Sequence, residues 1–235
     1  MTLPLLLSVP HAGLVVPEEA APYCRLSHEE IVADGDVGAA EIYDLEDHVA
    51  RFITTDVARA IVDLNRAADD RRADGVVKTH TCWNVPVYEP PPPLEALETL
   101  LAKYYHPYHD RLREAMRESM QAGDVRLCVD CHTMAAEAPP IGPEPGSPRP
   151  KVCLGDANGT TLPLGWMDLL ADCFRRGCEG AVTVNNPFSG GYITRTHGKA
   201  MPWVQVELSR GPFMTNAEKR GLVRTTLTAF CDEVL

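Results

Sequence analysis

The chain of 235 residues lacks an apolar run long enough to cross a membrane. Its first apolar stretch, LPLLLSVP, is short, has no basic residues before it, and leads directly to His11. This pattern argues against a secretory signal peptide and is typical of a first strand. We therefore expect a cytoplasmic protein without a membrane partner.

Positive charge is also scarce. The sequence has 22 Lys and Arg against 33 Asp and Glu, which gives a formal net charge of -11 and a pI near 5.1. This balance argues against non-specific binding to nucleic acid. An acidic small molecule would need a local cationic pocket set against the overall negative field.

A second cysteine pair with metal-binding spacing is missing. Of the eight cysteines, Cys128 and Cys131 form a C-x-x-C, but they lie in a run that predicts a strand. Residues three apart on a strand point to opposite faces, so these thiols should diverge. We expect eight free thiols rather than a structural zinc site or a redox pair.

Internal repeats and low-complexity linkers are absent too, and strand-like runs alternate with helical patterns. The strands are expected at 5–10, within 51–66 as a strand pair or hairpin, and at 125–133, 152–156, 180–186 and 202–210. Helices are expected after Ser27, through Ile42, over 94–123 with a kink at Pro107, over 162–177 and at the C-terminus. We expect residues 1–235 to form a single α/β domain with a largely parallel sheet. Residues 67–93, 134–151 and 187–201 read as loops, and the first is long enough to be functional or disordered.

Reactive side chains follow several of these strands. They are His11, Asn65, Arg66, His132, Glu207 and Arg210. Ligands of open α/β sheets bind at the carboxyl ends of the strands, so these residues should converge on one edge.

His11 and His132 are candidate zinc ligands, because a catalytic zinc takes three protein ligands and keeps one position open. The third ligand is expected to be a carboxylate, with Asp36 preferred over Asp34. Alternatively, each histidine serves a structural role and Asp36 caps a helix.

Glu207 lies inside the apolar strand WVQVELS, where an unpaired carboxylate is costly. It is either the partner of a neighbouring arginine or a general base with a pKa raised towards neutrality. His106 and His109, on the long helix, are expected to pack or support rather than bind metal.

The cationic candidates are Arg59, Arg66, Arg195 and Arg210. Asn65 and Arg66 stand side by side and together can hold a substrate carboxylate. The glycines of NPFSGGYITR allow a close approach of the backbone to a ligand, with Tyr192 and Arg195 closing over it. Alternatively, each arginine lies at the surface without a role in binding, and the two glycines form a plain turn.

Six ordered motifs, SVPHAG, VDLNR, YYHPYH, DCHT, NNPFSGGYITR and VQVELSR, resemble those of the N-formylglutamate amidohydrolase family. The resemblance runs from about His11 to Arg210 and implies a zinc-carboxypeptidase-like α/β domain with a mixed, mostly parallel sheet flanked by helices. It also implies a hydrolytic zinc site, a relation to aspartoacylases, and a reaction in histidine degradation.

Carried over residue by residue, the resemblance implies zinc ligation by His11 and His132 and by a carboxylate in the loop that holds Asp36. It implies that Glu207 is the general base and that Arg59 polarises the scissile carbonyl. Substrate contacts are implied for Asn65, Arg66, Tyr192 and Arg195.

The sequence departs from the related families at three places. Leu14 stands where the carboxypeptidase H-x-x-E pattern would have its glutamate, and both THGKAM and TCWNVPVYEPPPP look divergent. The expected activity is zinc-dependent hydrolysis of a small acidic N-acyl amino acid, with N-formyl-L-glutamate as the leading case. Alternatives are a deacylase for another N-acyl amino acid, a carboxypeptidase-like peptidase, and a non-catalytic binder of acidic ligands. The oligomeric state is left open.

Overall fold

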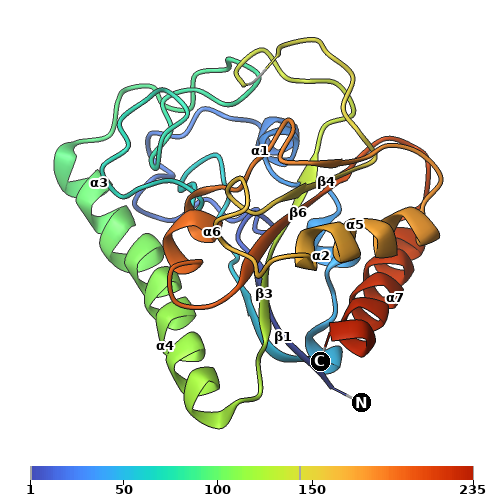
Figure 1. Ribbon diagram of the computed structural model, residues 1–235. Coiled ribbons are helices and arrows are strands. Elements are labelled where there is room, and N and C mark those ends of the chain that lie inside the picture. The colour runs from blue at the N-terminus through green and yellow to red at the C-terminus, as the bar shows by residue number, and fades with distance from the viewer. Residues whose placement is uncertain (1, 143, 235) are drawn as a thin grey trace.

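The computed structural model describes residues 2–142 and 144–234, and these form one six-stranded sheet (Figure 1). Its strands follow the order β2 (Val49–Thr54), β1 (Leu3–Val9), β3 (Leu127–Met134), β6 (Trp203–Ser209), β4 (Val152–Gly155) and β5 (Val182–Val184). Only β4 and β6 pair antiparallel among these neighbours. The expected α/β class with a mixed, mostly parallel sheet is confirmed.

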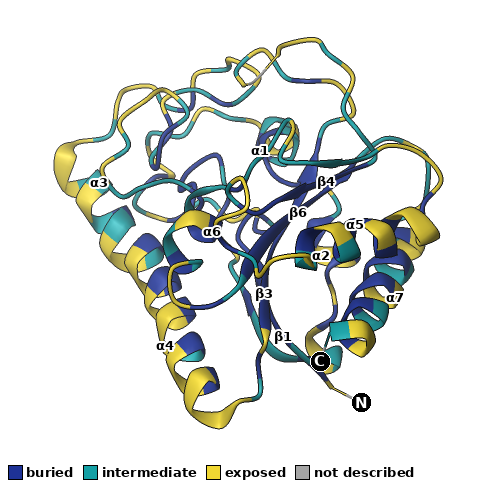
Figure 2. Cartoon of the chain, viewed as in Figure 1, coloured by how far each residue is buried: buried dark blue, intermediate teal, exposed yellow. Residues whose placement is uncertain are grey.

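Helices cover both faces of the sheet. One apolar core packs α2 (Ala39–Ile42), α5 (Trp166–Gly177) and α7 (Asn216–Val234) against it. A second core, on the opposite face, holds α3 (Leu94–Leu100), α4 (His106–Ala122), α6 (Tyr192–His197) and α1 (His28–Asp34). The short 3₁₀ helix η1 (Glu46–His48) precedes β2. In Figure 2 the strands β3, β4 and β6 are buried throughout, whereas α4 has one buried and one exposed side.

The two cores separate the cysteines of the C-x-x-C. Cys128 belongs to the core under α4, and Cys131 to the core under α5 and α7. Both thiols are fully buried, and all eight cysteines are free. The expected divergence of this pair is therefore confirmed, since successive residues of β3 point to opposite faces and residues three apart do so too.

The expected capping signature at α1 is also present. The Ser27 hydroxyl accepts a hydrogen bond from the Glu30 amide, and the Glu30 carboxylate accepts one from the Ser27 amide. This reciprocal arrangement satisfies two amides of the first turn. Helix α1 therefore begins where the sequence indicates, and it leads to the loop that carries Asp36.

The long helix over 94–123 changes its hydrogen bonding just before Pro107. A π-helical turn, η2 (Leu101–Tyr105), joins α3 to α4, and Pro107 stands in the first turn of α4. Proline has no amide hydrogen and its ring crowds the carbonyl four residues earlier, so a widened turn accommodates it. The chain therefore continues as helix α4 after the π-helical turn instead of leaving the helical conformation.

The expected second strand within 51–66 is wrong. Only β2 is a strand, and residues 58–64 form buried turns in which the amides of Ile61 and Val62 both bond the Ala58 carbonyl. Ile61, Val62 and Leu64 are fully buried in the second core. The β-branched residues of this segment therefore indicate burial rather than an extended backbone, because β-propensity largely measures how well a side chain packs.

The loop expected over 187–201 contains a helix instead. Helix α6 starts directly after Gly191 and buries Ile193, Thr194 and His197. Six residues are too few for a helical period to stand out in the sequence, and the glycines before it suggested a turn. The correction matters because α6 places Tyr192 and Arg195 on a rigid element.

The segment 67–93 is a long loop without regular helices or strands, as expected. It is anchored by side chains that point inward, among them Val76, Lys78 and Val87, each almost fully buried. Within the described part of the chain, none of the helices combines the length and apolar character that a membrane span requires.

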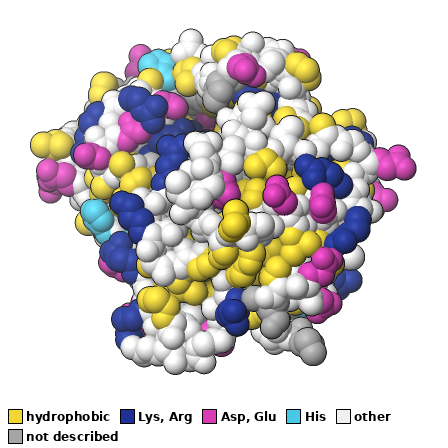
Figure 3. Space-filling view, viewed as in Figure 1, with side chains coloured by type: hydrophobic (Ala, Val, Ile, Leu, Met, Phe, Trp, Pro, Cys, Tyr) yellow, Lys and Arg dark blue, Asp and Glu magenta, His cyan; other side chains and the backbone are white. Residues whose placement is uncertain are grey.

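Loops gather above the carboxyl ends of the strands, at the top of the view in Figure 1. On the face shown in Figure 3, Lys and Arg side chains gather in the upper left, within this loop layer.

Candidate functional site

A cleft of about 780 Å³ opens at the carboxyl ends of the central strands. His11 lies two residues beyond β1, His132 belongs to β3, and Glu207 is paired with His132 in register on β6. Asp36 enters from the loop between α1 and α2. The structure thus brings to one edge of the sheet the residues that the sequence placed near strand ends.

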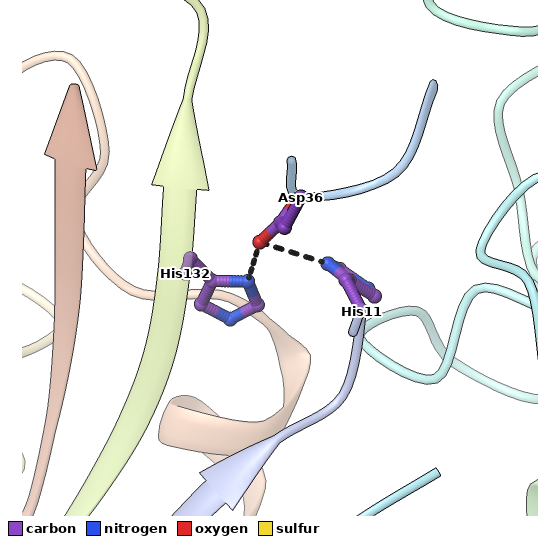
Figure 4. Close-up of side chains that lie close together, drawn as sticks. All are labelled: His11, Asp36 and His132. Atoms are coloured by element: carbon purple, nitrogen blue, oxygen red, sulfur yellow. Dashed lines mark hydrogen bonds and ion pairs between the residues drawn. The ribbon is translucent and has the colours of Figure 1, made fainter. Parts of the chain in front are cut away.

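His11, Asp36 and His132 form a buried cluster at the base of this cleft (Figure 4). Asp36 Oδ2 lies 3.0 Å from His132 Nδ1 and 3.6 Å from His11 Nδ1. One ligand atom from each residue lies within 4.8 Å of the others. In Figure 4 the imidazole of His132, from a strand, and that of His11, from the coil beyond a strand, both turn one nitrogen toward the same carboxylate oxygen.

Two further carboxylates orient these imidazoles. His11 Nε2 donates to Asp63 Oδ1 at 2.9 Å, and because a carboxylate only accepts, His11 is left with a lone pair on Nδ1. His132 has a carboxylate at each ring nitrogen: Nε2 lies 3.0 Å from Asp130 Oδ1, and Nδ1 lies 3.0 Å from Asp36 Oδ2. Burial alone would lower the pKa of His132, but these two acids hold it well above its ordinary value. Carboxylate–histidine pairs of this kind fix metal-binding imidazoles.

Sequence reasoning missed Asp63 and passed over Asp130 as an orienting residue. Asp130 stands two positions before His132 on the same strand, so the period of two places both on one face. That signal was available. Asp63 gives no such signal, because it sits in the buried turns after β2 and reaches His11 only through tertiary folding.

The cluster suits a metal ion with nitrogen and oxygen ligands. His11 Nδ1 is buried and has no hydrogen-bond partner among the described residues, which is costly unless another group fills the position. Burial alone would raise the pKa of the Asp36 carboxyl, but His11 and His132 hold that pKa well below its usual range. The lone pair of His11 Nδ1, the ionised Asp36 carboxylate and His132 Nδ1 thus face one point.

Asp34, the alternative third ligand, points elsewhere. Its carboxylate lies 2.7 Å from Lys78 Nζ and accepts the Cys82 amide at 2.7 Å. Both Asp34 and Lys78 are nearly inaccessible to solvent. Asp34 therefore anchors the 67–93 loop beneath the cleft, and the geometry favours Asp36 at the cluster. Leu14 is 43% exposed, so nothing at that position supplies a ligand.

Glu207 lines the same cleft and is only 7% exposed. Within the described chain it forms no ion pair, and the Gln205 amide donates a hydrogen bond to its Oε1 at 2.8 Å. Burial raises the pKa of Glu207, and the nearby His132 partly opposes this rise. Between the two alternatives for Glu207, the geometry favours the general base over the salt bridge.

Arg59 also reaches this centre. Its guanidinium lies 3.3 Å from Asp36 Oδ1 and 3.2 Å from Asp63 Oδ2, and its side chain is 19% exposed. Arg59 thus contacts both the candidate ligand Asp36 and the residue that orients His11. It lines the cleft, where a positive charge can face a substrate oxygen.

Asn65 is more deeply engaged than the sequence suggested. Its Nδ2 donates to Asp130 Oδ2 at 3.2 Å, and its Oδ1 accepts the Ile193 amide at 2.8 Å. Asn65 therefore connects the start of α6 to the carboxylate that holds His132. The amide still lines the cleft, so substrate contact by Asn65 stays a prediction.

Among the arginines that line the cleft, Arg66, Arg195 and Arg210 differ in their partners. Arg66 lies 3.3 Å from Asp74, whereas Arg195 contacts the Ser189 hydroxyl at 3.0 Å. The Arg210 guanidinium donates to the Ala33 and Thr133 carbonyls, both at 3.3 Å. Arg210 thus keeps its charge without a carboxylate partner among the described ion pairs. Tyr192 lines the cleft beside these groups, as expected.

His109 forms a buried pair with His197 behind the site. His109 Nδ1 lies 3.2 Å from His197 Nε2, and His109 Nε2 donates to the Leu64 carbonyl at 3.0 Å. Burial lowers the pKa of each imidazole to about 4, so both are neutral near pH 7. The expected packing and supporting role of His109 is consistent with this arrangement, and His106 is absent from the cleft lining.

Two curated proteins and one solved structure are similar to this chain over most of its length. The N-formylglutamate deformylase of Pseudomonas putida is 27% identical over 231 residues, covering 92% of this chain and 84% of that protein. The N-formylglutamate deformylase of Pseudomonas aeruginosa is 26% identical over 225 residues, covering 90% and 82%. The crystal structure of an N-formylglutamate amidohydrolase from Ralstonia eutropha JMP134 matches with a TM-score of 0.80 at 21% identity, over 99% of this chain and 93% of that one. At that identity the match shows a shared fold.

The family assignment rests on the sequence as a whole. The model of the N-formylglutamate amidohydrolase family matches residues 3–214. That span starts at β1 and ends beyond β6, so it includes every strand and every cluster residue described above. The chain therefore belongs to the N-formylglutamate amidohydrolase family.

Proposed function

We propose that residues 1–235 form one catalytic domain that hydrolyses the amide bond of a small acidic N-acyl amino acid with the help of a bound zinc ion. N-formyl-L-glutamate, the substrate in the names of the relatives above, is the leading case. One observation carries the proposal. One nitrogen from each of two imidazoles and a carboxylate converge beside the buried, unpaired carboxylate of Glu207 at the base of a cleft.

His11, Asp36 and His132 would hold the zinc, each through the atom that already faces the common centre. When bound, zinc supplies a Lewis acid that polarises a carbonyl and lowers the pKa of water to about 7. Asp63 and Asp130 would hold the Nε2 hydrogens of the two imidazoles while Nδ1 of each binds the metal.

Glu207 acts as the general base in this proposal. It takes a proton from the attacking water as the water oxygen bonds to the formyl carbon, and it then passes that proton to the departing amine nitrogen. The C–N bond breaks, and formate and the free amino acid leave. A carboxylate that is buried and has a raised pKa suits both directions of transfer.

Arg59 stabilises the charge that develops on the former carbonyl oxygen. Its guanidinium lines the cleft and is fixed by Asp36 and Asp63, so it need not reorganise during the reaction. Removing one such contact typically costs about 3 kcal/mol of transition-state stabilisation.

The substrate carboxylates would be held by the remaining cationic side chains of the cleft. Arg66 with Asn65, and Arg195 with Tyr192, are the contacts that we expect from the sequence, and all four side chains line the cleft. Arg210 is an additional candidate, since only backbone carbonyls compensate its guanidinium among the described contacts. These charges supply the local cationic pocket that an acidic protein needs for an acidic ligand.

A formate-release assay combined with metal analysis tests the function. The purified protein should release formate and glutamate in equal amounts from N-formyl-L-glutamate, contain about one zinc per chain, and lose both properties on chelation. Turnover of N-acetyl-L-glutamate or of a peptide C-terminus at a higher kcat/KM would favour the related hydrolases. Binding of N-formyl-L-glutamate without turnover, with zinc present, would favour the non-catalytic binder.

A further inference from the structure

Gln205 contacts both Glu207, the candidate base, and the loop at Gly190 and Gly191, called the glycine loop below. It is two positions before Glu207 on β6, so both side chains lie on the same face of the sheet. Gln205 is 4% exposed and lines the cleft. Its Nε2 donates to Glu207 Oε1 at 2.8 Å, and its Oε1 accepts a hydrogen bond from the Gly191 amide.

The contact with Gly191 decides which way the amide of Gln205 points. A backbone N–H can only donate, so the carbonyl oxygen of Gln205 must face Gly191. The NH₂ group is then directed at Glu207, and the side chain cannot flip without placing two donors against each other. Such a contact favours the ionised carboxylate, the form that a base requires.

The two oxygens of Glu207 are thereby made different. Oε1 is held by Gln205, whereas Oε2 makes no hydrogen bond within the part of the chain that the structure describes. One oxygen therefore sets the orientation of the carboxylate, and the other is available to a water molecule in the cleft. A carboxylate without this restraint would rotate between several orientations, of which few suit proton transfer.

The glycine loop reaches Gln205 because it lacks side chains at the point of approach. A Cβ at Gly191 would lie 2.2 Å from Asn65 Nδ2. The loop is thus held by two side-chain amides: Gln205 accepts from Gly191, and Asn65 accepts from Ile193. Each amide has its other end on a carboxylate of the site, Glu207 or Asp130.

We propose that Gln205 is a positioning residue that fixes the orientation of Glu207 and ties it to the loop at Gly191. The inference rests on the proposed function, because it assigns Glu207 as the base. A displacement of Gly191, which directly precedes the helix that carries Tyr192 and Arg195, would loosen the base through this connection. Substrate contact with the loop and proton transfer are thereby linked through one side chain.

Two substitutions separate this role from simple packing. Gln205→Glu keeps the size and the acceptor for Gly191 but removes the donor to Glu207, and Gln205→Met removes both polar contacts. Asn185→Asp is the matched control. Asn185 also uses both ends of its amide, accepting from the Asp156 amide and donating to Asp156 Oδ1 at 2.8 Å, but it does not line the cleft.

The measurements are kcat and KM for N-formyl-L-glutamate, zinc content and melting temperature. Both Gln205 variants should lose kcat by about tenfold or more, with KM within about threefold of wild type and zinc retained. The Asn185→Asp variant should keep the wild-type kcat and KM.

Three results would overturn the proposal. The first is a kcat within about twofold of wild type in Gln205→Glu. The second is a change confined to KM, which would make Gln205 a substrate contact. The third is a failure of both variants to fold, which would make it a packing residue. Absence of formate release by the wild-type protein would instead reject the proposed function, so the two failures are distinguishable.

Discussion

Each histidine of the candidate metal site has a carboxylate beside its Nε2 atom, and this explains how both Nδ1 atoms come to face one centre. Asp63 accepts a hydrogen bond from His11 Nε2, Asp130 lies 3.0 Å from His132 Nε2, and both carboxylates are completely buried. Buried charges of this kind are costly unless they are paired. Arg59 compensates Asp63, so the cationic group and the orienting acid support each other.

The first residue-scale prediction concerns zinc. His11→Ala and His132→Ala should each empty the site, and Asp36→Ala should lower its zinc content, because each removes one of three ligands. Asp63→Asn should weaken zinc affinity by about 10- to 100-fold, since it removes an orienting carboxylate. Metal analysis after dialysis measures both effects, with His28→Ala, an exposed histidine on α1, as the control. Full zinc retention in Asp36→Ala would mean that another acid supplies the third ligand.

The second prediction concerns Glu207. Glu207→Gln should lower kcat by on the order of a hundredfold or more with zinc still bound, since it keeps the shape and removes the proton acceptor. The base works as a carboxylate, and burial raises its pKa above the ordinary 4.5. Wild-type activity should therefore be present above that raised pKa and be lost as the pH falls through it. A kcat profile that stays flat down to pH 4.5 would contradict this assignment.

A third prediction concerns which carboxylate Arg66 and Arg210 bind. Arg66→Ala should lower kcat/KM for N-formyl-L-glutamate by about 30-fold or more, because a charge-assisted contact is lost. N-formyl-L-glutamine should be affected far less if Arg66 binds the side-chain carboxylate, and equally if it binds the α-carboxylate. Arg71→Ala, an exposed neighbour whose guanidinium contacts the Ala68 carbonyl, is the control. Unchanged kinetics in Arg66→Ala, with a loss in Arg210→Ala, would move the role to Arg210.

At the scale of elements, the site depends on how α4 and α6 pack behind the sheet. His109 of α4 and His197 of α6 stack with ring centroids 5.5 Å apart, and His109 also bonds the Leu64 carbonyl just before Asn65. Thr194 of α6 contacts Asp130 at 3.3 Å. The two helices thus fix the backbone that carries the amide of Asn65 and the loop above it.

The histidine pair predicts a pH dependence of stability. Burial lowers the pKa of both imidazoles to about 4, with Arg113 opposing protonation of each, whereas an unfolded histidine titrates near 6.5. The unfolded state therefore binds protons first as the pH falls. The stability contributed by the neutral pair is fully present above about pH 6.5 and is lost between there and pH 4.

Urea unfolding at pH 7 and pH 5 measures this effect. The free energy of unfolding should fall by roughly 2 kcal/mol per histidine between these two values. A His109→Gln, His197→Gln double variant should lose correspondingly less over the same interval, even if it starts less stable. His28→Gln should behave like wild type. An identical fall in the double variant would show that other groups cause the pH dependence.

At the scale of the whole molecule, an acidic protein gathers several arginines at one edge of its sheet. The formal net charge is -11, yet arginines from four separate segments line a single cleft. In and beneath the cleft, the acids are largely committed to holding imidazoles, lysine or arginine. The remaining cationic groups can therefore attract an anionic substrate to a protein that would repel it elsewhere.

Much of this organisation could be predicted from the sequence. The alternation of strands and helices, the strand ends at His11 and His132, and the acid inside an apolar strand at Glu207 are local patterns. A strand of period two also determines that Cys128 and Cys131 diverge, and that Asp130 shares a face with His132. Local patterns suffice here because backbone geometry alone decides where neighbouring side chains point.

Tertiary structure decided the rest, because it depends on contacts between residues distant in the chain. Residues 58–64 are apolar and β-branched, but they lie as buried turns, since packing rather than strand pairing satisfies them. The choice between Asp34 and Asp36 depends on Lys78, 44 positions beyond Asp34, which neutralises that acid inside the core. The contact between Asp63 and His11 joins residues 52 positions apart, so only the folded chain determines it. It forms because a buried charge is costly unless it is paired.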